Sequence, residues 1–355
     1  MSLRPYTVLL LVPTGIGAAI GGYAGDALPV ARAVSTLADV LITHPNVLNG
    51  AQLYWPLCQT LYVEGYGLDQ FAAGHWGLQP VHQNRVGLLL DQAIEPELRV
   101  RHLQAADAVR ATLGITLTEA VITDQPLGVE LRLSESGASW GTLNRPDSLL
   151  RGAKRLIEEA KADAIAVISR FPDDPSSFLL QQYRQGQGVD ALAGAEAVIS
   201  HLIVRQFQIP CAHAPALDPL PLELDLSPKA AAEEIGYTFL PCVLVGLSRA
   251  PQFLPAPGPT PGIWANQVDA VVVPATACGS SAILSLCQQT QTRIIAVEEN
   301  QTQMRVKPEA LGIRADHVHS YLEALGVLAA HKAGINPGAL RSTLPPLTVL
   351  SSATL

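Results

Sequence analysis

Cys278 is the side chain of this sequence with the clearest potential for nucleophilic or proton-transfer chemistry. It lies in the segment 276–281, Thr-Ala-Cys-Gly-Ser-Ser, between an apolar run and the expected start of a helix. A helix N-terminus lowers the pKa of a nearby thiol, and its backbone amides can stabilise an oxyanion. We therefore predict that Cys278 is catalytic; the alternative is a buried cysteine that packs as a small apolar side chain. The ligand-binding residues predicted beside it are Thr276, Gly279, Ser280 and Ser281.

His44 and Glu299 are the other two predicted catalytic residues. His44 stands in the segment 43–46, Thr-His-Pro-Asn, where the proline favours an extended approach that holds the imidazole at a strand end as a base. Glu299 follows another apolar run and offers a carboxylate for proton transfer. For His44 the alternative is a histidine that only hydrogen-bonds to a neighbouring loop. The predicted ligand-binding amides near these residues are Asn46, Asn49 and Asn300.

The glycine-rich loop of residues 14–26 is a third candidate. Glycines let backbone amides approach an anion, and the start of the following helix adds a favourable dipole. We expect a phosphate, carboxylate or amide to bind here; the alternative is a tight crossover with a structural role only. Arg170 and Arg249 follow further apolar runs and are expected to neutralise an anionic ligand. The predicted ligand-binding residues of the loop are Thr14, Gly15, Gly17, Gly21, Gly22 and Asp26.

Known cofactor motifs are not satisfied, so the cofactor stays unknown. Gly15-x-Gly17 is followed by Ile20 where a dinucleotide fingerprint needs its third glycine, and Thr43-His44 ends the second strand without a ribose-binding acid. The sequence has no Tyr-xxx-Lys pair and no GxxxxGK[ST] motif, so neither NAD nor ATP is indicated.

A metal site is also weakly indicated. Cys211 and His213 place two ligand types on one extended segment, and Glu64, His75 and His82 offer further ligands. No HxxxH or HExxH spacing accompanies them, and we expect no protein-bound metal.

The elements that position these residues alternate between strands and helices. Such alternation implies right-handed βαβ units, so we predict an α/β fold with mainly parallel sheets and helices on both faces. Apolar runs predict strands over residues 6–12, 40–43, 86–90, 164–169, 238–247, 269–273 and 293–297. Helical patterns cover residues 29–38, 98–113, 148–161, 191–206, 280–289 and 319–333.

We expect two Rossmann-like lobes. Residues 1–125 form the first lobe with the glycine-rich loop, and residues 126–355 form the second, with a hairpin over 129–145 and an extended proline-rich loop over 251–262. The carboxyl ends of parallel strands meet at one edge, so a shared site is predicted at a rim formed by residues 14–26, 43–46 and 276–281.

Composition limits the classes of partner. The 355 residues include 31 acidic and 23 basic side chains, and the formal charge of −8, without a basic stripe, excludes sequence-independent nucleic-acid binding. Only 15% of the residues are charged, which favours a homo-oligomer. The expected ligand is a small anionic molecule.

The location predicted from the sequence is cytoplasmic. The five cysteines are an odd number and form no CxxC pair, which is typical of a reducing compartment. Residues 5–25 carry no charge before Asp26, but proline and glycines interrupt them, and a buried strand followed by a loop explains their apolarity without a membrane.

Several blocks resemble a family of unknown function found in cyanobacteria and plastids: VPTGIGAAIGGYAGDALPVAR, LITHPNVLNGAQLYW, SESGASWGTLNRPDSLLRGA, VPATACGSSAILS and IIAVEENQTQM. The resemblance covers nearly the whole chain and implies a soluble protein of a photosynthetic lineage, without an activity. Thr276-Ala277-Cys278 is also similar to the two-lobed aspartate/glutamate racemase group, which places a thiol on each lobe. Here the first rim carries Thr14 and His44 instead of a thiol.

Two functional hypotheses follow. The first is an enzyme of the isomerase or racemase, lyase or transferase type that acts on a small anionic metabolite at the predicted rim. The second is a non-catalytic ligand-binding or assembly protein of photosynthetic cells.

Overall fold

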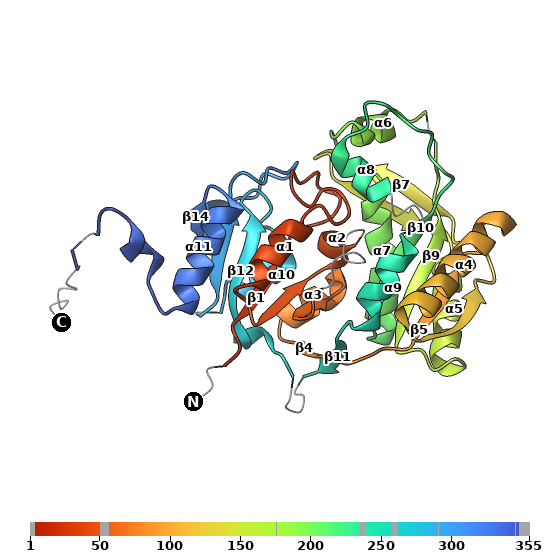
Figure 1. The fold of residues 1–355 in the computed structure, drawn as a ribbon, viewed down its shortest axis with the longest axis horizontal. Helices are drawn as coiled ribbons and strands as arrows, with labels where there is room; N and C mark the ends of the chain where they lie inside the picture. The colour runs from red at the N-terminus through yellow and green to blue at the C-terminus, as the bar shows by residue number, and fades with distance from the viewer. Residues whose placement is uncertain are drawn as a thin grey trace.

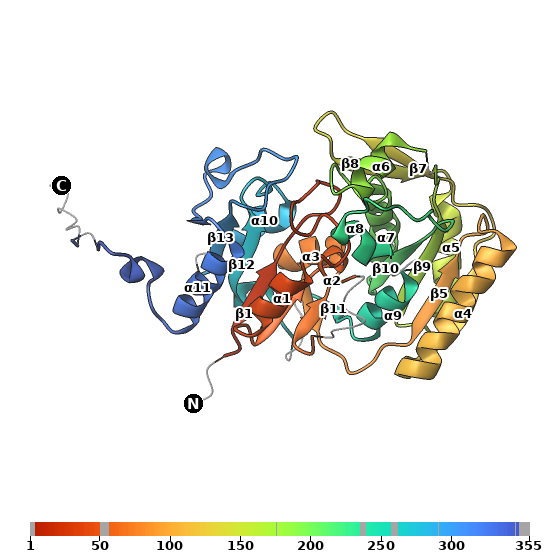
Figure 2. The same cartoon turned by 45° about the horizontal axis from the view of Figure 1, so that its top comes forward.

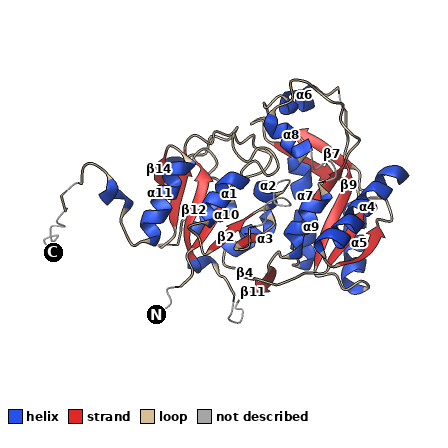
Figure 3. Cartoon of the chain, viewed as in Figure 1, coloured by secondary structure: helices blue, strands red, loops and turns tan. Residues whose placement is uncertain are grey.

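Two parallel β-sheets form the centres of two lobes that lie side by side (Figures 1 and 3). The computed structural model describes residues 4–49, 57–174, 176–234, 239–256, 262–289, 291–344 and 346–347. Helices cover both faces of each sheet, so the predicted α/β fold is confirmed.

The first sheet has six strands in the order β14-β13-β12-β1-β2-β3, and every neighbouring pair is parallel. The strand order reverses between β1 and β12, so the connections that leave these two strands diverge at the carboxyl edge. The strands are β1 (Thr7–Leu10), β2 (Val40–Thr43), β3 (Thr60–Tyr62), β12 (Val268–Pro274), β13 (Arg293–Val297) and β14 (Asp316–Val318).

The second sheet has four parallel strands in the order β10-β9-β5-β6. Its central strands are apolar on both faces because helices pack against both sides. The strands are β5 (Val86–Leu90), β6 (Leu117–Ile122), β9 (Ala164–Arg170) and β10 (Cys211–Ala216).

Each sheet lies between two pairs of helices that bury its alternate side chains. On the first sheet these are α1 (Leu28–Ser35) with α11 (Tyr321–Lys332), and α3 (Gly65–Ala72) with α10 (Ser281–Leu286). On the second sheet they are α4 (Pro96–Leu113) with α9 (Leu240–Ser248), and α5 (Pro146–Glu158) with α7 (Ala193–Phe207). The shorter helices are α2 (Pro45–Leu48), α6 (Phe178–Arg184), α8 (Pro228–Glu234) and the 3₁₀ turns Ala265–Gln267 and Pro308–Leu311.

The lobes divide the chain differently from the predicted boundary at residue 125. Strands β12, β13 and β14 return to the first sheet and pair beside β1, so the first lobe contains both ends of the chain. The second lobe is an insertion that carries β5, β6, β9 and β10. The sequence does not indicate that β12 pairs with β1, because the strands of both sheets are similarly apolar and their pairing is decided by the tertiary fold.

Residues 238–247 do not form the predicted strand. Their described part belongs to α9, which is apolar on all sides because it packs against the second sheet, α4 and α2. A short apolar run fits a buried helix as well as a buried strand. Gly246 lets α9 approach the first lobe, since a Cβ at this position would lie 2.6 Å from the Tyr62 ring.

The predicted hairpin is confirmed. Strands β7 (Val129–Leu133) and β8 (Ser139–Leu143) pair antiparallel, and β8 packs against the N-terminal part of α7. Part of the proline-rich segment 251–262 forms β11 (Gln252–Pro255), which pairs antiparallel with β4 (Trp76–Gln79). Residues 257–261 of that segment lie outside the described residues.

The two ends of the described chain differ in their surroundings. Residues 7–10 form the buried strand β1, as expected for the apolar start of the sequence. The C-terminal segment with the 3₁₀ turn Pro337–Leu340 extends away from the first lobe in two views (Figures 1 and 2). Leu340, Leu344 and Leu347 are exposed on this segment. The expected homo-oligomer stays a prediction. No helix in the described part of the chain is long and apolar enough to cross a membrane.

Candidate functional site

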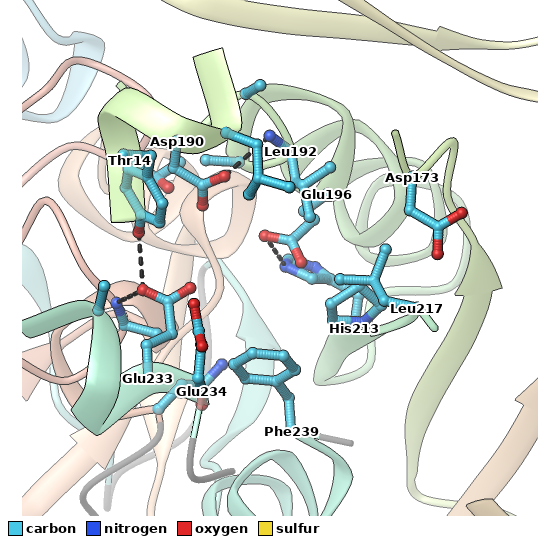
Figure 4. A pocket seen from close by; sticks show the side chains of 18 of the residues that line it. Thr14, Asp173, Asp190, Leu192, Glu196, His213, Leu217, Glu233, Glu234 and Phe239 are labelled. Atoms are coloured by element: carbon cyan, nitrogen blue, oxygen red, sulfur yellow. Dashed lines mark hydrogen bonds and ion pairs between the residues drawn. The ribbon is translucent and has the colours of Figure 1, made fainter. Parts of the chain in front are cut away.

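A cavity of about 750 Å³ lies between the two lobes. Its first wall consists of residues that follow β1, β2 and β3, and its second wall of residues from β10, α6, α7, α8 and the segment after β9 (Figure 4). The cavity therefore opens at the carboxyl ends of strands from both sheets, where α/β proteins bind ligands. Its volume is in the range of small-molecule sites.

Four predicted site residues line the first wall: Thr14, His44, Asn46 and Asn49. The amide of Asn46 donates to the carbonyl of Gly21 at 2.5 Å, and the Asn49 Oδ1 accepts from the Tyr62 hydroxyl at 2.7 Å. Both amides thus hold neighbouring backbone or side chains in place while they face the cavity.

His44 is buried and uncharged. Its Nε2 accepts a hydrogen bond from the backbone N–H of Val12 at 3.2 Å. Burial lowers the pKa of His44 to about 4, although the bond from Val12 acts in the opposite direction. The nitrogen that would take a proton is already occupied, so the structure favours a positioning role for His44 over the predicted role as a base.

Hydrogen bonds from Asn300 and Asp26 hold the glycine-rich loop in place, so these polar groups are already used within the protein. Asn300 is fully buried, accepts from the N–H of Ile20 at 2.9 Å and donates to the carbonyl of Ile20 at 2.8 Å. Asp26 accepts from the N–H of Gly21 at 2.5 Å and forms an ion pair with Lys229 at 3.0 Å. Gly21 has φ +91°, and a Cβ there would lie 2.6 Å from Val12, so this turn requires glycine.

The other predicted loop residues also have structural surroundings. Gly15 and Gly17 have positive φ, and a Cβ at Gly22 would collide with the Ala18 carbonyl. None of Gly15, Gly17, Gly21, Gly22, Asp26 and Asn300 lines the cavity. This arrangement matches the alternative of a tight crossover, in which Thr14 and Ala24 are the loop residues that line the cavity.

Three carboxylates converge in the cavity from the second lobe. Figure 4 shows the side chains of Asp190, Glu196 and Glu233 directed toward a common space. Asp190 and Glu196 lie at the N-terminus of α7, where the helix dipole favours acidic residues, and Asp190 accepts from the N–H of Leu192 at 2.8 Å. Glu233, near the end of α8, accepts from the Tyr183 hydroxyl at 2.7 Å and from the N–H of Ala24 at 3.1 Å.

The environment of Asp190 and Glu233 favours their neutral forms. Burial, followed by repulsion from Glu196, raises the pKa of Asp190 to about 7. Burial, followed by repulsion from Asp190, raises the pKa of Glu233 to about 8. Neighbouring carboxyl groups whose pKa values are moved into the neutral range are typical of acid-base sites.

Two histidines stand beside the acids. His213 Nε2 lies 3.4 Å from Glu196 Oε2, and His213 Nδ1 lies 3.3 Å from the Ser200 hydroxyl. On the other side, His201 Nδ1 lies 2.7 Å from Glu64 Oε1. Burial alone would lower the pKa of His201, but the contact with Glu64 raises it overall.

The remaining wall is mostly apolar. Leu179, Leu180, Leu192, Leu217, Leu226 and Phe239 all line the cavity. Large apolar side chains around a few polar groups are typical of small-molecule sites, and the low polarity near the acids opposes their ionisation.

Cys278 does not reach this cavity. The side chain is fully buried among the apolar residues between the first sheet, α3 and α10. Burial raises the pKa of the Cys278 thiol to about 11, the opposite of the shift expected for a nucleophile. This packing argues against the predicted catalytic role, because burial of the thiol outweighs the nearby helix start, and the role stays a prediction.

The residues around Cys278 have structural partners as well. The Ser280 hydroxyl caps α10 by accepting from the N–H of Ile283 at 3.4 Å, and Thr276 lies 2.9 Å from the Thr302 hydroxyl. A Cβ at Gly279 would lie 3.0 Å from Val306. Segment 276–281, including Ser281, follows a strand of the same sheet as His44, as predicted, but it contributes nothing to the cavity lining.

Glu299, Arg170 and Arg249 also differ from their predicted roles. Glu299 accepts from the N–H of Tyr321 at 2.9 Å and does not line the cavity. Arg249 follows helix α9 instead of a strand, so it is not at the expected edge. Arg170 follows β9 as predicted, but it forms ion pairs within 3.1 Å with three carboxylates, those of Glu95, Asp173 and Asp218. It therefore holds acids beside the cavity instead of facing a ligand.

Sequence reasoning did not identify Asp190, Glu196 and Glu233. They lie in a loop and in helices without a recognised motif. The one local indication is the predicted helix start at residue 191, where acidic side chains are favoured. The metal hypothesis did single out His213 and Glu64, and both line the cavity. Among the described residues, no group of three or more His, Cys, Asp and Glu is placed to hold a metal ion.

Comparisons with known proteins give a relative but no structural counterpart. An uncharacterized lipoprotein of Synechococcus sp. is 61% identical over 338 residues, which cover 95% of this chain and 94% of the relative. No solved structure is similar to the chain. The predicted cytoplasmic location is wrong on this comparison, because lipoprotein is the name of a class attached to membranes through a lipid.

The comparison confirms the expectation of an uncharacterised family with a cyanobacterial member. The family model described as "Protein of unknown function (DUF3326)" matches residues 7–341, which include both sheets and the whole lining of the cavity. The chain belongs to the DUF3326 family.

Proposed function

We propose that this protein is an enzyme of the isomerase or lyase type that moves protons on a small molecule bound between the lobes. The observation that carries the proposal is the convergence of Asp190, Glu196 and Glu233 in one largely apolar cavity. Such surroundings keep a carboxylic acid neutral at physiological pH, so that it can donate a proton.

The acids at the start of α7 and the acid at the end of α8 suit different roles. Glu233 holds its proton at neutral pH and is the proposed general acid. The pair of His213 and Glu196 is the proposed base, because a carboxylate 3.4 Å from an imidazole nitrogen stabilises the imidazolium that forms when the ring takes a proton. Asp190 raises the pKa of Glu233 further by repulsion.

Cys278 has no part in this mechanism. A base on α7 or β10 removes a proton from the substrate, and Glu233 on α8 returns one, so both steps use residues of the second lobe. Thr14, Asn46 and Asn49 of the first lobe are the proposed hydrogen-bonding groups that orient the molecule.

Deuterium exchange tests the proposal without knowledge of the substrate. The protein is incubated in D₂O with a small-molecule extract of Synechococcus, and incorporation is followed by mass spectrometry. An enzyme that removes a carbon-bound proton exchanges it with solvent, so we expect at least one small molecule to gain deuterium at carbon. Retention of a small molecule without any such exchange would instead support a non-catalytic ligand-binding protein.

A further inference from the structure

We propose that the ligand of this cavity carries a basic group, such as a protonated amine, on an apolar body. The inference rests on the cavity of the proposed function, and it replaces the small anionic molecule expected from the sequence. It follows from the charges that line the site, from which of them already have partners, and from the walls.

Apart from His44, which accepts from the Val12 N–H, the basic side chains of the lining are already paired with acids. Arg184 is almost fully buried and lies 2.6 Å from Glu223 and 2.8 Å from Glu234. His201 and His213 have Glu64 and Glu196 as their partners. An anionic ligand would have to break one of these pairs, and a buried carboxylate that loses its partner is costly.

Two acids of the lining have no such partner. Among the described residues, neither Asp190 nor Glu233 forms an ion pair with a lysine, arginine or histidine. Their hydrogen bonds come from the N–H of Leu192, the N–H of Ala24 and the Tyr183 hydroxyl. Once one of them is ionised, the space they share lacks one positive charge, which an ammonium group can supply with hydrogen bonds to more than one carboxyl group.

The apolar side chains of the cavity walls indicate that the rest of the ligand is apolar. Leu192, Leu217 and Phe239 all line the cavity, and Figure 4 shows Leu217 beside His213 and Phe239 below it. Burial of alkyl or ring carbon against these side chains removes apolar surface from water and favours binding. A compact inorganic cation or a highly hydroxylated sugar would leave this apolar surface unused.

Binding of a cation by these acids has a defined pH dependence. A bound ammonium group stabilises an ionised carboxylate, so binding releases a proton wherever the free protein keeps it. Asp190 has the lower pKa of the two acids and ionises first, which leaves Glu233 its proton. Asp190 and Glu233 hold their protons up to about pH 7 and 8, whereas a primary amine stays protonated to about pH 10. The affinity for an amine should therefore rise between pH 6 and pH 8.5. The other titratable or charged groups that face the cavity include His44, His201, His213, Glu64, Glu196, Glu234, Asp173, Asp218, Tyr183 and Arg184.

Three probes of equal length test the inference with the full chain: hexylamine, 1-hexanol and hexanoate, measured by ligand-detected NMR and calorimetry at pH 6.5 and 8.5. We expect hexylamine to bind at least tenfold more tightly than hexanol at pH 8.5, hexanoate to bind most weakly, and the preference for hexylamine to shrink at pH 6.5. Asp190→Asn and Glu233→Gln should each reduce the preference about tenfold without changing hexanol binding. Glu119→Gln, an exposed acid on β6, is the matched control.

The outcomes separate this inference from the proposed function. A preference for hexanoate, or a preference for hexylamine that survives in the Asp190→Asn/Glu233→Gln double variant, would overturn the basic ligand. Deuterium exchange at carbon would still stand in that case. Conversely, a preference for hexylamine without any deuterium exchange would retain the ligand class and reject the enzyme.

Discussion

Replacing Glu233 by glutamine is expected to slow deuterium exchange at carbon by about 10²- to 10⁴-fold, the usual contribution of a positioned general acid. Glutamine has nearly the shape of the protonated glutamic acid and can still accept from the N–H of Ala24, but it cannot donate an acidic proton. The loop around Ala24 should therefore keep its contact with α8, and the thermal midpoint should change little. The measurement is the initial rate of deuterium incorporation for the wild type and the variant at pH 7.

Glu119→Gln makes the same chemical change on the exposed side of β6 and should leave the exchange rate unaltered. If Glu233→Gln instead exchanges within twofold of the wild type while it remains folded, Glu233 is not the acid.

Replacing Cys278 by serine is expected to lower the free energy of unfolding by about 1–3 kcal/mol and to leave the exchange rate unchanged. The thiol is fully buried, and its Sγ has only distant acceptors, the carbonyls of Pro274 and Ala275 at 3.7 Å. A serine hydroxyl forms a hydrogen bond only with an acceptor closer than these carbonyls. Part of the free energy lost when the hydroxyl leaves water is therefore not regained. Urea denaturation measures the loss.

Cys58→Ser is the control for this change, because Cys58 is exposed and its replacement should stay within about 0.5 kcal/mol of the wild type. A Cys278→Ser protein that is as stable as the wild type but no longer exchanges deuterium would restore the thiol as a catalytic group.

The sequence predicts the edge of the site better than its centre. The apolar runs that end at Val12 and Thr43 are strands of one parallel sheet, and the residues that follow them, Thr14 and His44, do line the cavity. This part is predictable because a parallel sheet aligns the carboxyl ends of its strands irrespective of the helices around it.

Cys278 shows where a local pattern is insufficient. Its position between β12 and α10 is that of many reactive thiols, and the strand and the helix both exist as expected. Whether a side chain at such a position faces solvent or the core depends on what packs above it, and here α3 covers this face of the sheet. No spacing in the sequence contains that information.

The acids of the second lobe could not be assigned for a similar reason. Asp190, Glu196 and Glu233 are separated along the chain and meet because α7 and α8 both end at the cavity. The raised pKa values of Asp190 and Glu233 arise from burial and from repulsion by neighbouring carboxylates, and no motif encodes either cause. The return of β12 to the first sheet, which contradicts a boundary at residue 125, is likewise a property of strand pairing.

Titration of the carboxyl groups tests the central claim, that this cavity keeps acids protonated at neutral pH, most directly. The protein is labelled with ¹³C at the side-chain carboxyls of aspartate and glutamate, and the two signals of interest are assigned by their loss in Asp190→Asn and Glu233→Gln. Because burial raises both pKa values, each group should keep its proton through the acid range and lose it only as the pH rises, with midpoints of about 7 for Asp190 and about 8 for Glu233. Midpoints near the ordinary values of about 3.9 and 4.3 would show that both acids are ionised at neutral pH and would contradict the account.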